Sequence, residues 1–120
     1  MLVYLASPYS HPDPIVRDER YRAVCQAVAA MLFAGQSVFS PIVYSHSLVA
    51  YGAPTDWLFW ERYDREMLSR CDRLVVLMLP GWRESVGVQA EIQIAQKMGK
   101  PVMFLSPEEI SVSVGGVLEC

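Results

Sequence analysis

Apolar residues in this chain fall into short unbroken runs that are separated by longer stretches of helical periodicity. The runs Leu2–Ala6, Ser37–Phe39, Leu74–Leu79 and Pro101–Leu105 predict four strands. The third run is aliphatic throughout, which is typical of a central strand in a parallel sheet that is covered on both faces.

Between these runs, apolar positions recur at spacings of three and four, which is the period of a helix. The first helix is expected after Asp13-Pro14, a capping residue followed by proline, and should end at Gly35. A second is expected from Trp57 to about Arg70, and a third from about Ser85 to Met98. Residues 41–55 lack a clean period, so we predict a functional loop there, with short helical turns at most. The tail from Glu108 to Cys120 fits a short helix followed by a turn at Gly115-Gly116.

Alternation of strands and helices predicts right-handed crossovers and a parallel sheet. We therefore expect a three-layer α/β fold with a flavodoxin-like (Rossmann-like), doubly wound parallel sheet of four to five strands. A length of 120 residues fits one domain spanning residues 1–120. Such sheets bind ligands beyond the carboxyl ends of their strands, which places the site among Ala6–Ser10, Pro41–His46 and Pro80–Glu91.

Composition bears on assembly and partners. Hydrophobic residues make up 52% of the chain and charged residues 19%, so a small monomer would have difficulty burying its apolar surface. We therefore expect a homo-oligomer, either a dimer or a tetramer. A net charge of −3 provides no basic surface for a nucleic-acid polymer or an anionic membrane. No apolar stretch is long enough to span a membrane, and Met1 leads directly into a strand, so we expect a cytoplasmic protein.

The cysteines Cys25, Cys71 and Cys120 are odd in number and scattered, and only His11 and His46 could act as further soft ligands. This spacing favours neither a disulfide framework nor a zinc site. We expect no metal and no other cofactor.

Two carboxylates interrupt the apolar stripes of the predicted helices. Asp64 is the one charge on the stripe of its helix, and Glu91 is the one charge on the stripe of the next helix, two turns after Pro80-Gly81. A buried carboxylate is costly unless it has a partner or faces a pocket. The structural alternatives are a bond from Asp64 to an amide or an arginine, and a solvated Glu91 near a positive helix end. Two inward acids at the ligand edge suit glycosidic-bond chemistry, in which one attacks the anomeric carbon and the other moves protons.

Three further candidates carry an aromatic ring or an imidazole. Tyr4 lies in the first predicted strand, where it is either a core aromatic or a site residue. His46 lies in the long loop, where it is an acid–base group, a donor to a nucleobase, or a solvated residue. Trp82 also lies in a loop, and it is the best candidate for stacking on a base. Trp57, Phe59 and Trp60 could also stack on a base, but aromatics at helical spacing are usually core residues.

Other candidates lie where the predicted strands end. Ser85 and the free amides of its helix would bind an anion, and Gly87 would let a ligand approach closely. Ser7, Tyr9 and Ser10 follow the first predicted strand and are placed to contact a substrate.

These residues occur in an order that resembles a known family. The motifs are Tyr4-Leu5-Ala6-Ser7-Pro8-Tyr9, Asp64 ahead of Cys71-Asp72, Pro80-Gly81-Trp82, and Ser85-x-Gly87-x-x-x-Glu91. They resemble the nucleoside 2-deoxyribosyltransferase superfamily over roughly Leu2–Leu105, and most of all a bacterial and phage branch of unassigned function. The resemblance implies that Glu91 is the nucleophile, that Asp64 positions or protonates the substrate, and that Tyr4 orients the glutamate.

The resemblance implies cleavage or transfer of the N-glycosidic bond of a small-molecule (deoxy)nucleoside or its 5′-monophosphate. In related deoxynucleoside-monophosphate hydrolases, the serine matching Ser85 contacts the phosphate. Those hydrolases carry a glycine-rich, arginine-bearing loop where this chain has Ser7-Pro8-Tyr9-Ser10, which leaves the phosphate requirement open. The alternatives are a non-catalytic nucleotide-binding module of the same fold and an FMN carrier in which Trp82 stacks on the flavin. The presence of both Glu91 and Asp64 favours the enzyme.

Overall fold

The structure is a computed structural model of the chain, and it describes residues 1–110. The predicted turn at Gly115-Gly116 lies outside the described residues, as does Cys120. In chain order the elements are β1 (Leu2–Ala6), α1 (Pro14–Phe33), β2 (Ser37–Phe39), α2 (Pro41–Val49), α3 (Trp57–Ser69), β3 (Arg73–Leu77), α4 (Val86–Lys97) and β4 (Val102–Leu105). Residues 107–110 are again helical.

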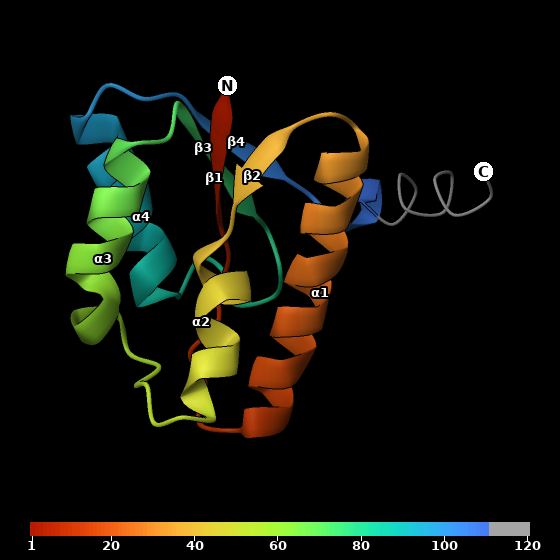
Figure 1. The fold of residues 1–120 in the computed structure, drawn as a ribbon, viewed down its shortest axis with the longest axis vertical. Helices are drawn as coiled ribbons and strands as arrows, with labels where there is room; N and C mark the ends of the chain where they lie inside the picture. The colour runs from red at the N-terminus through yellow and green to blue at the C-terminus, as the bar shows by residue number, and fades with distance from the viewer. Residues whose placement is uncertain (111–120) are drawn as a thin grey trace.

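The sheet forms the middle of three layers. Its four strands are all parallel and run in the order β2-β1-β3-β4. Helices α1 and α2 cover one face, and α3 and α4 cover the other (Figure 1). The predicted flavodoxin-like, doubly wound α/β fold is therefore confirmed, with four strands within residues 1–110. The strand order reverses between β1 and β3, which is where open sheets of this kind bind ligands.

Alternation along β1 divides the core into two halves. Val3 and Leu5 pack with residues of α1 on one side of the sheet, whereas Tyr4 and Ala6 pack with residues of α3 and α4 on the other. Tyr4 is fully buried. Its strand neighbours are Phe39 on β2 and Leu74 on β3, so its ring is held in the middle of the sheet.

Capping residues start the predicted helices close to the expected positions. The Asp13 side chain accepts a hydrogen bond from the amide of Ile15 at 2.9 Å and begins α1, as predicted. Asp56 caps α3 and Ser85 caps α4. These three caps fix where the helices enter the carboxyl edge of the sheet, and α3 and α4 carry Asp64 and Glu91.

Residues 41–49 are a helix, which corrects the prediction of a loop over residues 41–55. Ser40 is the N-cap, and its hydroxyl accepts from the amide of Val43 at 3.2 Å. Pro41 occupies the first turn, where its missing N–H costs nothing. The local capping signal therefore outweighed the absence of a clean apolar period.

Several large apolar side chains remain exposed in the described part of the chain, notably Tyr44, Tyr51, Leu58 and Phe59. They are compatible with the homo-oligomer expected from composition, which stays a prediction. None of the helices within residues 1–110 is long and apolar enough to cross a membrane.

Lys100 joins the end of α3 to the turn between α4 and β4. Its ammonium group donates to the carbonyl of Leu68 at 2.9 Å, to that of Ser69 at 2.7 Å, and also to that of Cys71. A cation at these carbonyls adds charged donors at a helix C-terminus and complements the helix dipole.

Replacing Lys100 with methionine keeps the apolar stem and removes the donors, so we expect a loss of about 2 kcal/mol in the free energy of unfolding. Urea titration followed by circular dichroism measures this change. Lys97→Met is the matched control, because Lys97 is exposed at the end of α4 and should change stability by less than about 0.5 kcal/mol. Equal effects of the two substitutions would contradict the role of Lys100.

Candidate active site

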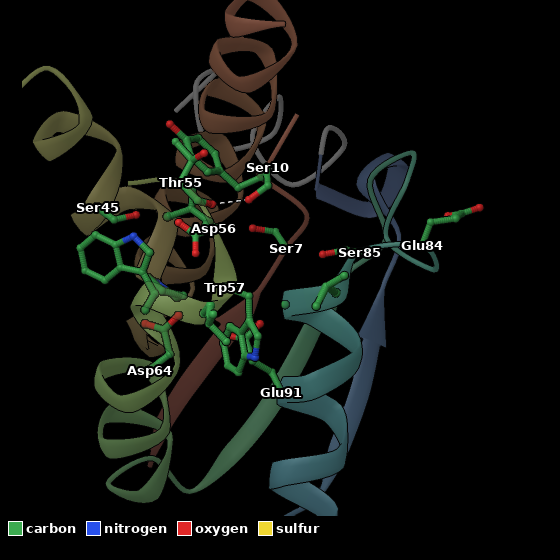
Figure 2. Close-up of a pocket in the computed structure, with 17 residues that line it drawn as sticks. Ser7, Ser10, Ser45, Thr55, Asp56, Trp57, Asp64, Glu84, Ser85 and Glu91 are labelled. Atoms are coloured by element: carbon green, nitrogen blue, oxygen red, sulfur yellow. Dashed lines mark hydrogen bonds between the residues drawn. The ribbon is translucent and has the colours of Figure 1, made fainter. Parts of the chain in front are cut away.

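A pocket of about 460 Å³ opens at the carboxyl ends of β1 and β3. Its walls come from the β1–α1 loop, α2, the segment that leads into α3, α3 itself, and the first two turns of α4. Figure 2 shows the polar side chains that surround it. These include Ser7, Ser10, Ser45, Thr55, Asp56, Asp64, Ser85 and Glu91.

Glu91 lies on the face of α4 that packs toward the sheet and forms part of the pocket wall. It is 4% exposed, so nearly all of the side chain is removed from water. Its Oε2 accepts a hydrogen bond from the hydroxyl of Tyr4 on β1. Burial, followed by the nearby charge of Asp64, raises the pKa of Glu91 to about 8, although the Tyr4 hydrogen bond acts in the opposite direction.

Asp64 lies on α3, across the pocket from α4, and is 7% exposed. Burial raises its pKa to about 7. Its Oδ1 has no hydrogen-bond partner among the described residues, and neither does the hydroxyl of Ser7. Buried polar atoms are almost always paired, so two unpaired ones in a single pocket indicate places where a ligand can bond.

Tyr4 connects the sheet to the pair of acids. Burial, then the charges of Glu91 and Asp64, raise the pKa of Tyr4 well above its ordinary value. The phenol therefore stays protonated at physiological pH and donates to Glu91. Because Tyr4 is fixed in the centre of the sheet, this bond fixes the orientation of the Glu91 carboxylate.

The N-terminus of α4 forms another part of the wall. The Ser85 hydroxyl accepts from the amide of Val88 at 3.2 Å, so it acts as the helix cap, while its own proton remains available to a ligand. A Cβ added at Gly87 would lie 3.6 Å from the ring of Trp57, which is ordinary contact. A side chain at position 87 would therefore not clash with the protein. Because Gly87 has none, this space is part of the pocket.

Arg20 on α1 ties two of the loops that line the pocket. Its guanidinium donates to the carbonyl of Ser10 at 3.0 Å and to that of Pro80 at 3.4 Å. Gly81 has a φ of 94°, and a Cβ there would meet Arg20 at 2.6 Å. The Ser10 hydroxyl in turn donates to the carbonyl of Thr55, so three segments of the pocket wall are joined.

The structure brings most of the predicted site residues together. Those in the pocket wall or bonded to it are Tyr4, Ser7, Tyr9, Ser10, Asp64, Ser85, Gly87 and Glu91. His46 and Trp82 do not line this pocket. Trp82 packs against Phe104 on β4 and lines a second, more open hollow on the far side of the β3–α4 loop. His46 lies on α2, where its Nδ1 is 2.8 Å from the hydroxyl of Tyr9.

Trp57 and Trp60 line the pocket, and Trp57 also packs against the core residues beneath α3 and α4. The signal that could have found them is their position in the first turn of α3, ahead of Asp64 on the same face. Within residues 1–110, no group of three or more histidine, cysteine, aspartate and glutamate side chains is arranged to hold a metal ion.

The fold is shared with a solved structure. The chain is similar to the 2-deoxyribosyltransferase from the psychrotolerant bacterium Bacillus psychrosaccharolyticus, with 26% identity and a TM-score of 0.65. The match covers 89% of this chain and 73% of that enzyme. The architecture is thus that of the nucleoside 2-deoxyribosyltransferase-like proteins.

The family model described as Domain of unknown function (DUF1937) matches residues 1–107, and the chain belongs to that family. No functionally curated protein matches the sequence. The family assignment agrees with the predicted branch of unassigned function.

The raised pKa values of Glu91 and Asp64 predict how stability depends on pH. Both values lie above the ordinary ones of 4.5 and 3.8, so the folded protein binds more protons than the unfolded chain between about pH 4 and 8. The contribution of these two groups to the free energy of unfolding is complete at a pH below their ordinary pKa values. It is lost as the pH rises through their folded-state pKa values of about 7 and 8.

Glu91→Gln should therefore unfold at a higher temperature than the wild type at pH 8, with a gain on the order of 2 kcal/mol, and should lose this advantage at pH 4. Glutamine can still accept the Tyr4 hydrogen bond, so the comparison isolates the charge. Calorimetric melting curves at several pH values measure the effect. Glu66→Gln, at an exposed position on α3, is the control. A pH slope identical in wild type and Glu91→Gln would refute the prediction.

Proposed function

We propose that this protein cleaves the N-glycosidic bond of a (deoxy)nucleoside, with Glu91 as nucleophile and Asp64 as acid. The similarity to a 2-deoxyribosyltransferase supports nucleoside glycosyl transfer at the level of the family. The observation that carries the proposal is the pair of buried carboxylates, which face one pocket at the point where the strand order reverses. Two carboxyl groups on either side of a pocket suit a reaction at an anomeric carbon.

In the first step, a carboxylate oxygen of Glu91 attacks C1′ of the sugar, and the bond between C1′ and the base nitrogen breaks. The electron pair of that bond leaves with the base, which takes a proton from Asp64. A pKa of about 7 keeps Asp64 partly protonated near neutral pH, as a general acid requires. The product of this step is a glycosyl ester on Glu91.

In the second step, water or another base attacks C1′ and releases Glu91 as a carboxylate. Asp64, now ionised, accepts the proton of the attacking group, so the site returns to its starting state. Tyr4 donates its hydrogen bond to Glu91 throughout. This bond favours the ionised carboxylate over the neutral acid and thereby offsets part of the cost of burial.

Substrate binding would use the rest of the wall. Trp57 and Trp60 offer flat apolar surfaces for a base, and the hydroxyls of Ser7 and Ser85 offer bonds to sugar oxygens. No lysine, arginine or histidine within residues 1–110 lines the pocket, whereas several carboxylates do. A 5′-phosphate would bring two more negative charges to that wall. We therefore propose the unphosphorylated nucleoside as the better substrate.

Chromatographic detection of free base tests the reaction. Wild type should release base from a panel of deoxynucleosides and ribonucleosides, and Glu91→Gln should lose at least about a thousandfold in rate. Asp64→Asn should lose about a hundredfold to ten-thousandfold. Glu66→Gln, whose site is exposed on α3, should retain the wild-type rate. A folded wild type that binds nucleosides and releases no base would identify a nucleotide- or nucleoside-binding module instead.

The same assay decides between nucleosides and nucleotides. We expect kcat/KM for the preferred nucleoside to exceed that for its 5′-monophosphate by at least about tenfold. The reason is that the phosphate and the carboxylates of the pocket wall repel each other, which disfavours binding by about a kilocalorie per mole or more. The preference should shrink at high salt if charge is the cause. A higher kcat/KM for the monophosphate would contradict the charge argument while leaving the role of Glu91 intact.

A further inference from the structure

Tyr9, in the pocket wall, has its hydroxyl in a polar cluster between α1 and α2 that includes Arg17, Asp18 and His46. It follows β1 and is 7% exposed. Its hydroxyl lies 2.8 Å from Nδ1 of His46, and the two rings meet edge to face at a centroid distance of 5.6 Å. The contact joins positions 37 residues apart, and neither the proposed chemistry nor the sheet requires it.

The other side of His46 is also occupied. Its Nε2 lies 3.8 Å from a carboxylate oxygen of Asp18 on α1. The ring stacks on Tyr21, also on α1, with a centroid distance of 3.9 Å and an interplanar angle of 16°. His46 is therefore held by contacts on its edge and on its face, while Asp18 is itself anchored by Arg22 at 2.9 Å.

These contacts bear on the direction of the hydrogen bond between Tyr9 and His46. The Asp18 carboxylate favours a proton on Nε2 of His46, because that nitrogen then points a positive dipole at a negative charge. With its proton on Nε2 alone, the ring presents the lone pair of Nδ1 to Tyr9. In that tautomer the Tyr9 hydroxyl donates to Nδ1, while the Asp18 carboxylate, 3.8 Å from Nε2, acts on the ring through its charge.

We propose that Asp18 and His46 are positioning residues that lock Tyr9 as a ligand-contacting wall of the pocket. An aromatic side chain at a pocket wall can change rotamer unless something holds its polar end. The hydrogen bond to His46 supplies that hold, so the ring is in place before the ligand arrives and less freedom is lost on binding. This inference rests on the proposed function, since the ligand it describes is the nucleoside.

The contribution of the lock is to binding and not to chemistry. The two acids and Tyr4 belong to the half of the core beneath α3 and α4, whereas Asp18, His46 and Tyr21 belong to α1 and α2. Loss of the lock should therefore raise KM and leave kcat nearly unchanged, as expected for an interaction that is equal in ground and transition states.

The first test uses His46→Phe and His46→Asn with the nucleoside that wild type cleaves best. Phenylalanine keeps the stack on Tyr21 and removes both ring nitrogens, so KM should rise about fivefold with kcat within twofold of wild type. Asparagine carries an oxygen on the same carbon that bears Nδ1 in histidine, so it can still accept from Tyr9 and should restore most of the affinity. His11→Gln, at the other histidine of the chain, is exposed and should match wild type.

A double-mutant cycle separates positioning from a structural effect. In a Tyr9→Phe background there is no hydroxyl to lock, so His46→Phe should have no further effect on KM. Additive effects of the two substitutions, or a fall in kcat with KM unchanged, would overturn the proposal. Melting temperatures of all variants, measured in parallel, identify any variant whose losses come from unfolding.

A spectroscopic measurement tests the lock without turnover. Nitrogen-15 NMR of the full chain should show His46 as the neutral tautomer with its proton on Nε2, and Tyr9→Phe should shift the Nδ1 resonance. A proton on Nδ1 would overturn the proposed direction. If wild type binds a nucleoside without cleaving it, the proposed function fails, and calorimetric Kd values replace KM in the same cycle. If wild type binds none of the nucleosides, both the function and the lock are overturned.

Discussion

The desolvation of two carboxylates is the constraint on which the rest of this structure depends. Asp64 and Glu91 are both more than nine-tenths buried, and burial is the first cause of the raised pKa of each. The free-energy cost of burying these carboxyl groups is offset by apolar packing elsewhere, in the stripes of α3 and α4 and in the aliphatic strand β3. This burial brings the pKa of Asp64 to about 7, which suits a group that gains and loses a proton near neutral pH.

Rigid elements hold these acids, and loops supply the surroundings. Tyr4 is fixed between Phe39 and Leu74 in the sheet, and Glu91 is fixed by Tyr4 and by the second turn of α4. The bonds of Arg20 and Ser10 then join three loop segments to one another around the opening. A pocket built in this way has its two acids placed by the sheet and helices, while loops form much of the surrounding wall.

Whether a feature of the fold or the site could be predicted depends on how far apart its interacting residues lie in the sequence. The strands, three helices and both acids were predicted because each gives a local signal: a period, a cap, or a charge that breaks an apolar stripe. Helix α2 was missed because nine residues with proline, serine and histidine give no period, and its start depends on the single hydroxyl of Ser40. The contact between His46 and Tyr9 could not be predicted, since it depends on how α2 packs beside α1 after the chain has folded. The pocket positions of Trp57 and Trp60 depend in the same way on how α3 lies over the sheet.

The division of the core by β1 also separates the two acids from the residues that hold the β1–α1 loop. Residues on the side of α3 and α4 bring the two acids together. The folded state becomes less stable as the pH rises, because these buried carboxyl groups then ionise. Residues on the side of α1 and α2 contribute no acid to the pair, but they tie down Tyr9 and the β1–α1 loop through His46 and Arg20. Both sets of residues surround the segment that follows β1, so the packing on each face of the sheet affects the same pocket. Substitutions among the residues of α1 and α2 that hold Tyr9 can therefore be made without touching the two acids.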